Sequence, residues 1–203
     1  MMHPHTELRF INEAIGHGVV ATRDLPAGTI TWIQDDLDRV FSPEQVGSMH
    51  PLFADTMDKY CFRNGEGSWV FCWDHAKYVN HSFRSNCMTT AYNFEIAIRD
   101  IRAGEELTDD YGYLNVMRPF TAVDEGVGRT LVQNDDLIRY HKEWDAHLKK
   151  NWKSIINVRQ ELRPLMDPEM WERVKQIALG YAEMDSILNC YFDEHASSCV
   201  CKN

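Results

Sequence analysis

The sequence predicts an α+β protein in which a mainly β first part is followed by a helical second part. Short runs rich in β-branched and aromatic residues predict strands in the first half of the chain. After Gly112 the apolar residues recur at helical spacing instead. At 203 residues, the chain has the length expected of one domain with an appendage.

The strands are expected where apolar runs border turn-forming residues. These runs cover residues 18–22, 29–33, 69–73 and 94–98. The run at 69–73 follows a turn that contains Gly65 and Gly67, so it is expected to form one half of a hairpin.

Helix starts are indicated by capping residues followed by proline. Ser42-Pro43 and Asp167-Pro168 each place a capping side chain before a proline at the first helical position. A third helix is expected from about Asp135 until Pro164 breaks it. The apolar stripes comprise Leu137, Trp144, Leu148, Trp152, Ile155, Ile156 and Leu162 in that helix, and Val174, Ile177, Ala178, Tyr181, Met184 and Leu188 in the last one.

The charge balance favours cationic partners. The chain carries 21 Lys and Arg against 31 Asp and Glu, a formal net charge of −10. A nucleic-acid-binding protein needs a basic patch for phosphate contacts, and the sequence has none. It also lacks an apolar run of the roughly 20 residues that a membrane span needs, and the features of a signal peptide. We therefore expect a soluble, intracellular protein, cytoplasmic or nuclear in a eukaryote, that contacts neither nucleic acid nor membrane.

The six cysteines are unevenly placed, three in the first half and three near the end. An intracellular chain rarely builds a disulfide scaffold, so buried thiols without a metal are the favoured reading. The alternative is a zinc site made of Cys87, Cys190, Cys199 and Cys201.

Three polar segments stand out in the first part of the chain. They are Gly16-His17-Gly18, Asn80-His81-Ser82 running into Asn86-Cys87, and Gly104-Glu105-Glu106-Leu107 running into Asp110-Tyr111. Taken singly, each is an ordinary turn, polar loop or solvated edge. Together they resemble the SET-domain family of protein-lysine methyltransferases, which carries Gly-x-Gly, Asn-His-Ser-x-x-x-Asn-Cys and Gly-Glu-Glu-Leu-x-x-Asp-Tyr in this order. The resemblance covers roughly residues 6–116.

This resemblance implies a fold and a division of the chain. The fold would be the SET-type β-clip with a knot-like core, carrying a C-terminal α-helical extension. We expect the SET domain at 1–118, a connector in place of the usual post-SET segment at 119–134, the helical extension at 135–195 and a cysteine-containing tail at 196–203.

The resemblance also implies S-adenosylmethionine as cofactor. Main-chain atoms of Gly16, His17, Gly18 and Val19 would lie against it, where glycine permits a close approach. Asn80 would bond near its amino-acid end, and the His81 backbone would contact the adenine. Phe120 is a candidate to stack on the adenine, with ordinary packing as the alternative.

Tyr111 would then be the active-site tyrosine, and Tyr60 a second tyrosine in the channel for the substrate lysine. The implied reaction is methyl transfer to the lysine ε-amine of a basic protein, a histone being the first candidate. Asp35, Asp36 and Asp38 could face such a substrate or form a solvated loop. A catalytically silent SET-like module that binds peptides or partners is the alternative function.

Two features depart from the family pattern. Asp109 and Thr89 stand where family members often carry aromatic residues that set the number of methyl groups added, so that number is not predicted. The cysteines that usually follow Asp-Tyr-Gly are missing. We therefore expect the helical part to pack on the β-rich part and close the lysine channel, although its apolar stripe could instead form a homodimer.

Overall fold

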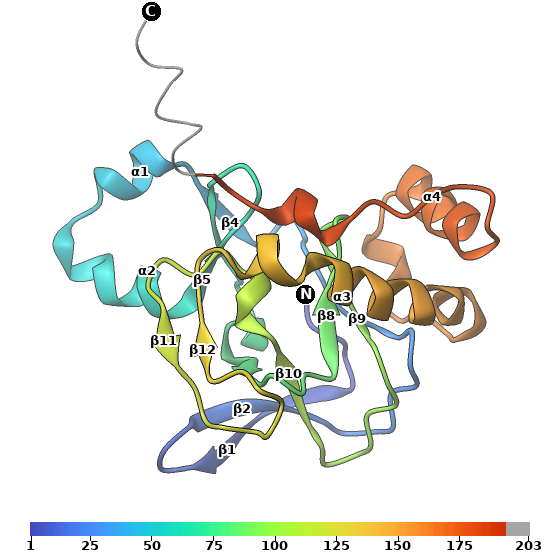
Figure 1. Cartoon of the computed structure of the whole chain (residues 1–203), viewed down its shortest axis with the longest axis horizontal. Helices are drawn as coiled ribbons and strands as arrows, with labels where there is room; N and C mark the ends of the chain where they lie inside the picture. Colours follow the sequence, from blue (N-terminus) through green and yellow to red (C-terminus); the bar gives the residue numbers. More distant parts are fainter. Residues whose placement is uncertain (194–203) are drawn as a thin grey trace, which may run out of the picture.

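The structure, a computed structural model, describes residues 1–193 and confirms the mixed α+β architecture (Figure 1). Its strands are β1 (Thr6–Asn12), β2 (Gly16–Ala21), β3 (Ile30–Ile33), β4 (Arg39–Phe41), β5 (Cys61–Arg63), β6 (Trp69–Phe71), β7 (Asn80–His81), β8 (Cys87–Thr89), β9 (Phe94–Ala97), β10 (Glu106–Asp109), β11 (Phe120–Thr121) and β12 (Leu131–Val132). Its α-helices are α1 (Pro43–Gly47), α2 (Ala54–Tyr60), α3 (Asp136–Trp152) and α4 (Pro168–Ala178).

The strands form small sheets rather than one large one. The orders are β1-β2-β10-β7, β3-β9-β8, β4-β6-β5 and β11-β12. Every pairing is antiparallel except β10 with β7. In Figure 1 the β1-β2 hairpin lies at one end of the molecule, with β10 crossing from it towards the centre. The four predicted strands are present as β2, β3, β6 and β9, and β6 does pair with β5 as a hairpin.

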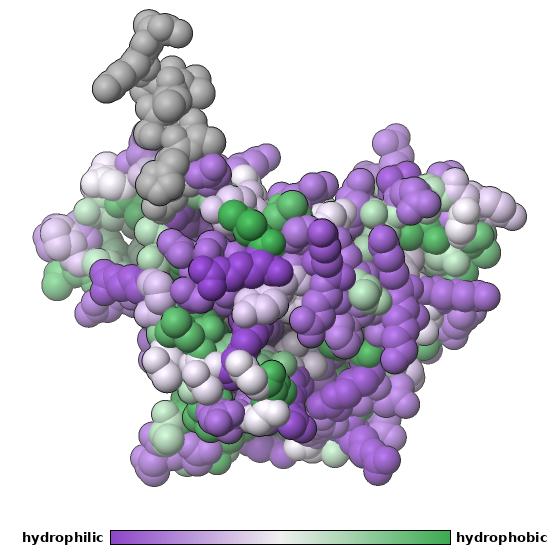
Figure 2. All heavy atoms as spheres, in the orientation of Figure 1, coloured by the Kyte–Doolittle hydropathy of each residue, from purple (hydrophilic) through white to green (hydrophobic). Residues whose placement is uncertain are grey.

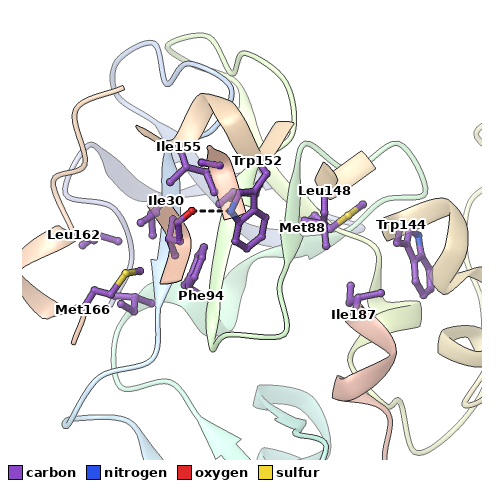
Figure 3. Close-up of a cluster of buried hydrophobic side chains, with 14 of the residues drawn as sticks. Ile30, Met88, Phe94, Trp144, Leu148, Trp152, Ile155, Leu162, Met166 and Ile187 are labelled. Carbon is purple, nitrogen blue, oxygen red and sulfur yellow. Dashed lines mark hydrogen bonds between the residues drawn. The ribbon is translucent and has the colours of Figure 1, made fainter. Parts of the chain in front are cut away.

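The larger buried core joins the sheet β3-β9-β8 to the helices. Ile30, Phe94 and Ile96 from the sheet pack in one cluster with Leu148 and Trp152 of α3. Figure 3 shows the Trp152 indole beside Phe94, with a hydrogen bond of 3.2 Å from its Nε1 to the Val174 carbonyl oxygen of α4. The expected packing of the helical part on the β-rich part is therefore present. The outward face of α3 is covered by hydrophilic side chains (Figure 2), so its apolar stripe already has a partner surface within the chain.

Two helix ends differ from the prediction. The helix that starts at Asp136 ends at Trp152 and continues only as a 3₁₀ turn at Lys153–Asn157, so the expected extension to Leu162 is wrong. The helix capped by Asp167 ends at Ala178, because Gly180 adopts a left-handed φ of +78°. Tyr181 is therefore exposed rather than part of an apolar stripe.

The connector contains structure that was not expected. Its ends pair as β11 and β12, so residues 119–134 form a small antiparallel ribbon rather than an irregular link. The predicted boundaries of the domain, connector and extension stay predictions, and the tail at 196–203 lies outside the described residues. Between residues 1 and 193, no helix is both long and apolar enough to cross a membrane.

Candidate active site

A cavity of about 350 Å³ opens beside the end of α2 and reaches into the β-rich part. Exposed Asp58 and Lys59 of α2 line its outer end, whereas buried Trp32 and Cys72 line its inner end. Its size falls in the range of small-molecule and side-chain binding pockets, about 300–1,000 Å³. Three of the predicted site residues, Tyr60, Tyr111 and Phe120, line this cavity.

Tyr111 begins a 3₁₀ turn, Tyr111–Tyr113, that directly follows β10. Its hydroxyl group donates a hydrogen bond of 2.6 Å to the Val79 carbonyl oxygen. Burial raises the pKa of Tyr111, and the nearby carboxyl groups of Asp109, Glu106 and Glu95 raise it further. Tyr111 is therefore a neutral phenol whose oxygen lone pairs remain available in the cavity.

The parallel pairing of β7 with β10 brings the second and third motifs together. Asn80 lies opposite Thr108, and His81 lies opposite Asp109. The pairing places His81 next to the turn that carries Tyr111, whose main-chain N–H donates to the His81 Nδ1 atom at 3.1 Å.

Asn80 connects these strands to the first motif. Its side-chain amide donates to the His17 carbonyl oxygen at 3.0 Å and to the Glu106 carboxylate at 2.7 Å. A Cβ atom on Gly18 would lie 2.2 Å from that carboxylate and 2.8 Å from the Asn80 amide nitrogen. Only glycine therefore lets the hairpin approach Asn80 this closely.

The His81 ring sits in an aromatic pocket. Its centroid is 4.5 Å from that of Phe83, 5.4 Å from Tyr111 and 5.6 Å from Phe120. Burial lowers the pKa of His81, so the ring is neutral near pH 7. Since Nδ1 accepts a hydrogen bond, the proton lies on Nε2, which is buried and has no partner among residues 1–193.

The remaining predicted residues fall into two groups. Tyr60 ends α2, and its ring packs edge-on against Tyr78, which in turn contacts the His17 ring. Gly16 opens β2 with a positive φ, but the Val19 side chain is fully buried in the smaller apolar core. The motif residues other than Tyr111 do not line the cavity itself. Most lie in or beside the sheet β2-β10-β7 behind Tyr111, and Cys87 lies in β8.

The helical part does not wall the cavity. Among the described residues, none after Phe120 lines the cavity. The outer wall comes from α2, β5 and the segment 114–119. The expectation that the helical part closes the channel is therefore wrong. The α3 stripe instead packs behind Tyr113, whose ring contacts Trp144 at 5.3 Å between centroids.

Two buried carboxyl groups, those of Glu95 and Asp109, also line the cavity, and the sequence did not identify Glu95 as a site residue. Glu95 of β9 and Asp109 of β10 are hydrogen-bonded to each other. Burial raises the pKa of both, and the Tyr113 hydroxyl donates to Asp109 at 2.8 Å. The sequence predicts a strand at 94–98 without assigning Glu95 a role, and the structure buries all of β9. The only signal for Asp109 was its replacement of an aromatic residue.

Arg129 is a second group that sequence reasoning missed. Its guanidinium forms ion pairs with the buried carboxylates of Asp110 and Asp136, and it lies over the rings of Phe83 and Tyr140. Asp110 in turn accepts the Gly112 N–H and caps the turn that carries Tyr111. Arg129 therefore ties the connector and α3 to the Tyr111 turn.

The acidic loop is partly used within the chain. Asp35 pairs with the amino terminus at 2.6 Å and accepts the Trp73 indole N–H, while Asp38 accepts the Trp73 main-chain N–H. Of the three aspartates, Asp36 is the exposed one. From the sequence, these aspartates are expected either to face a substrate or to form a solvated loop. Asp35 and Asp38 instead position Trp73.

The zinc alternative is not tested. Residues 1–193 contain no group of three or more metal-ligating side chains, and Cys199 and Cys201 lie outside the described residues. Cys87 is fully buried, and burial raises the pKa of its thiol well above the usual value. Cys190 contacts the Thr90 carbonyl oxygen.

Comparisons with known proteins bear on this arrangement. A family model of the SET domain matches residues 16–112, which contain all three motifs and end one residue after Tyr111. No curated protein matches the chain. The resemblance inferred from the motifs is confirmed by the family match. The family match therefore identifies SET-domain sequence in residues 16–112 of this chain.

Proposed function

We propose that this protein transfers a methyl group from S-adenosylmethionine to the ε-amine of a lysine in a basic protein. One observation carries the proposal: a half-buried, neutral Tyr111 lines a cavity of about 350 Å³ while the matched motifs converge directly behind it. SET domains are typical of protein-lysine methyltransferases, and Tyr111, Asn80 and His81 all occupy motif positions.

The residues behind Tyr111 fit the proposed cofactor. The His81 Nε2–H is an unpartnered buried donor flanked by aromatic faces, which suits a flat heterocycle bearing acceptor nitrogens. At Gly18 the hairpin backbone lies directly against the side chains of Asn80 and Glu106. The Glu106 carboxylate beside Asn80 suits a cation such as an ammonium or sulfonium group. When bound, S-adenosylmethionine supplies a methyl group activated by its sulfonium charge.

The chain's own contribution is alignment and exclusion of water. Methyl transfer needs a neutral amine, whereas a free lysine has a pKa of about 10.4. Exclusion of water from the cavity disfavours the ammonium form unless an anion pairs with it. The Tyr111 oxygen, fixed by its bond to the Val79 carbonyl, can accept a hydrogen bond from the amine and orient its lone pair. No covalent intermediate on the enzyme is needed, which agrees with cavity thiols whose pKa values burial raises.

The substrate is proposed to be a basic protein segment, with histones first to be tested. The net charge of −10 supports this choice, because such a field attracts cationic partners. The number of methyl groups transferred is left open by the proposal, since Asp109 replaces the usual aromatic side chain.

Ligand-induced stabilisation tests the cofactor site. S-adenosylmethionine at 100 times its Kd should raise the free energy of unfolding by about 2.7 kcal/mol, visible as a raised Tm. Asn80→Ala should abolish most of this shift, whereas Asn157→Ala, at an exposed asparagine outside the site, should leave it intact.

Transfer of a labelled methyl group to core histones and to lysate proteins tests the chemistry, with mass spectrometry locating any methylated lysine. A cofactor-induced shift without labelling of any protein would favour the silent SET-like module. The absence of both would overturn the proposal.

A further inference from the structure

We propose that the hydrogen-bonded carboxyl groups of Glu95 and Asp109 bind the alkylammonium group of the methyl acceptor inside the cavity, and that the Asp109 carboxylate takes its proton. This inference rests on the proposed function and deepens it, because it assigns the base that the reaction requires. It also gives Asp109 a role at the position where the family pattern has an aromatic side chain.

The pair lies at the buried end of the cavity that Tyr111 lines. Glu95 is 9% exposed and Asp109 is 3% exposed, whereas the opposite end is lined by exposed side chains such as Met117. A side chain that enters past the α2 end therefore meets the pair after passing Tyr60. Trp32 lines the same cavity, and its indole N–H is buried and has no hydrogen-bond partner among residues 1–193, so a polar group bound there could accept from it.

The two carboxyl groups share one proton. Burial raises the pKa of both groups and disfavours two adjacent charges, so one proton lies between them, on Glu95 when Asp109 is the hydrogen-bond acceptor. The Tyr113 hydroxyl supplies a second donor to Asp109 at 2.8 Å. One negative charge therefore resides on Asp109, in a site from which water is largely excluded.

That charge has no cationic side chain beside it. Among the described residues, no Lys, Arg or His forms an ion pair with Glu95 or Asp109. The amino-terminal ammonium acts on Glu95 from a distance, but Asp35 already pairs with it at 2.6 Å. The titratable groups that act on the pair are uncharged or acidic: Cys72, Cys87, Tyr111, Tyr113 and Asp110. The cationic side chains of the same cavity lining are Lys59, Arg63, Lys77 and Arg118. A buried carboxylate without a cation is costly, so an incoming ammonium would complete the site.

The other groups at this end of the cavity are unsuited to take a proton. Tyr111 keeps its own proton on the Val79 carbonyl, and burial raises the pKa of the Cys72 thiol. Burial raises the pKa of Asp109 and brings it closer to the pKa of an amine. The Asp109 carboxylate is therefore a better proton acceptor than an exposed one.

The step balances without a further reactant. One N–H bond of the acceptor's ammonium breaks, its electron pair stays on nitrogen, and an O–H bond forms on Asp109. The ammonium and the carboxylate become a neutral amine and a neutral carboxylic acid. When the methylated product leaves, the proton returns from Asp109 to water and the carboxylate is restored.

Binding of n-butylammonium chloride, which reproduces the end of a lysine side chain, tests the cation site directly. The readout is the Trp32 indole N–H signal in a ¹H–¹⁵N spectrum, assigned with Trp32→Phe. We expect wild-type protein to bind n-butylammonium at least tenfold more tightly than 1-butanol, and this preference to grow as the pH is raised through the titration of Asp109. Asp109→Asn should remove the preference, while Glu95→Gln, whose amide can still donate to Asp109, should keep it. Asp36→Asn removes one exposed charge and controls for net charge.

Equal affinity for the amine and the alcohol in wild-type protein, or an unchanged preference in Asp109→Asn, would overturn the inference. If Asp109→Asn fails to fold, the comparison of n-butylammonium with 1-butanol on wild-type protein still tests the cation site. In the labelling reaction, Asp109→Asn should lose at least tenfold in kcat at pH 7 and recover as the pH approaches the lysine pKa. Selective amine binding without any methyl transfer would refute the proposed function and leave the cation site in place. Methyl transfer with no effect of Asp109→Asn on binding or pH profile would refute the cation site and leave the proposed function in place.

Discussion

Replacing Arg129 by methionine is expected to destabilise the fold by about 3–5 kcal/mol, because it leaves two buried carboxylates without their cation. Asp110 and Asp136 have side chains only 4% and 1% exposed, and both pair with Arg129. For a chain of this length the loss corresponds to a fall in Tm of roughly 10 °C. Thermal and urea unfolding, followed by circular dichroism, measure it.

Arg139→Met provides the matched control. Arg139 pairs with Asp135 one helical turn away, but both side chains are largely exposed, so its removal should cost no more than about 0.5 kcal/mol. Arg129→Lys should fall between the two, since lysine keeps the charge but cannot reach both carboxylates with one planar group. Equal stabilities of Arg129→Met and Arg139→Met would contradict the role assigned to Arg129.

Replacing Tyr111 by phenylalanine is expected to lower kcat for methyl transfer by about 100-fold or more while cofactor binding persists. The change deletes the oxygen that orients the amine but retains the ring between His81 and Phe120. It also leaves the Val79 carbonyl without its donor, at a cost of about 1–3 kcal/mol if that oxygen stays buried. Initial rates with labelled S-adenosylmethionine, together with the cofactor-induced Tm shift, separate the two effects.

Tyr181→Phe is the control for this experiment, because Tyr181 is 79% exposed and lies just beyond α4. Its rate should match that of the wild type. If Tyr111→Phe loses the cofactor-induced shift along with the rate, Tyr111 supports the binding site rather than the transfer step.

Sequence reasoning reached the parts of the fold that local residues determine. The Ser42 cap of α1, the Asp167 cap of α4 and the β5-β6 hairpin each depend on neighbours within a few residues. It failed where an element's end depends on tertiary packing. The α3 stripe continues into 153–157 as a 3₁₀ turn, whose Ile155 still reaches the core.

The site residues also divide into those that local sequence identifies and those that depend on tertiary contacts. Tyr111, Asn80 and His81 were identifiable because they lie in ordered motifs, and the structure brings them together through the β7-β10 pairing. Glu95 could not be found from its neighbours, since only the juxtaposition of β9 and β10 turns an ordinary strand residue into a partner of Asp109. Arg129 was equally hidden, because its carboxylates lie 19 and 7 residues away on different elements.

The larger buried core, which joins the sheet β3-β9-β8 to the helices, has a practical consequence for designing shorter versions of the protein. A polypeptide trimmed to residues 16–112 would lack Leu148, Trp152 and Ile187, and it would present Ile30, Phe94 and Ile96 to solvent. It would also lack Met2, which is buried and bridges to Trp32. We expect such a fragment to aggregate on expression, so recombinant work on the Tyr111 cavity should retain both flanking regions.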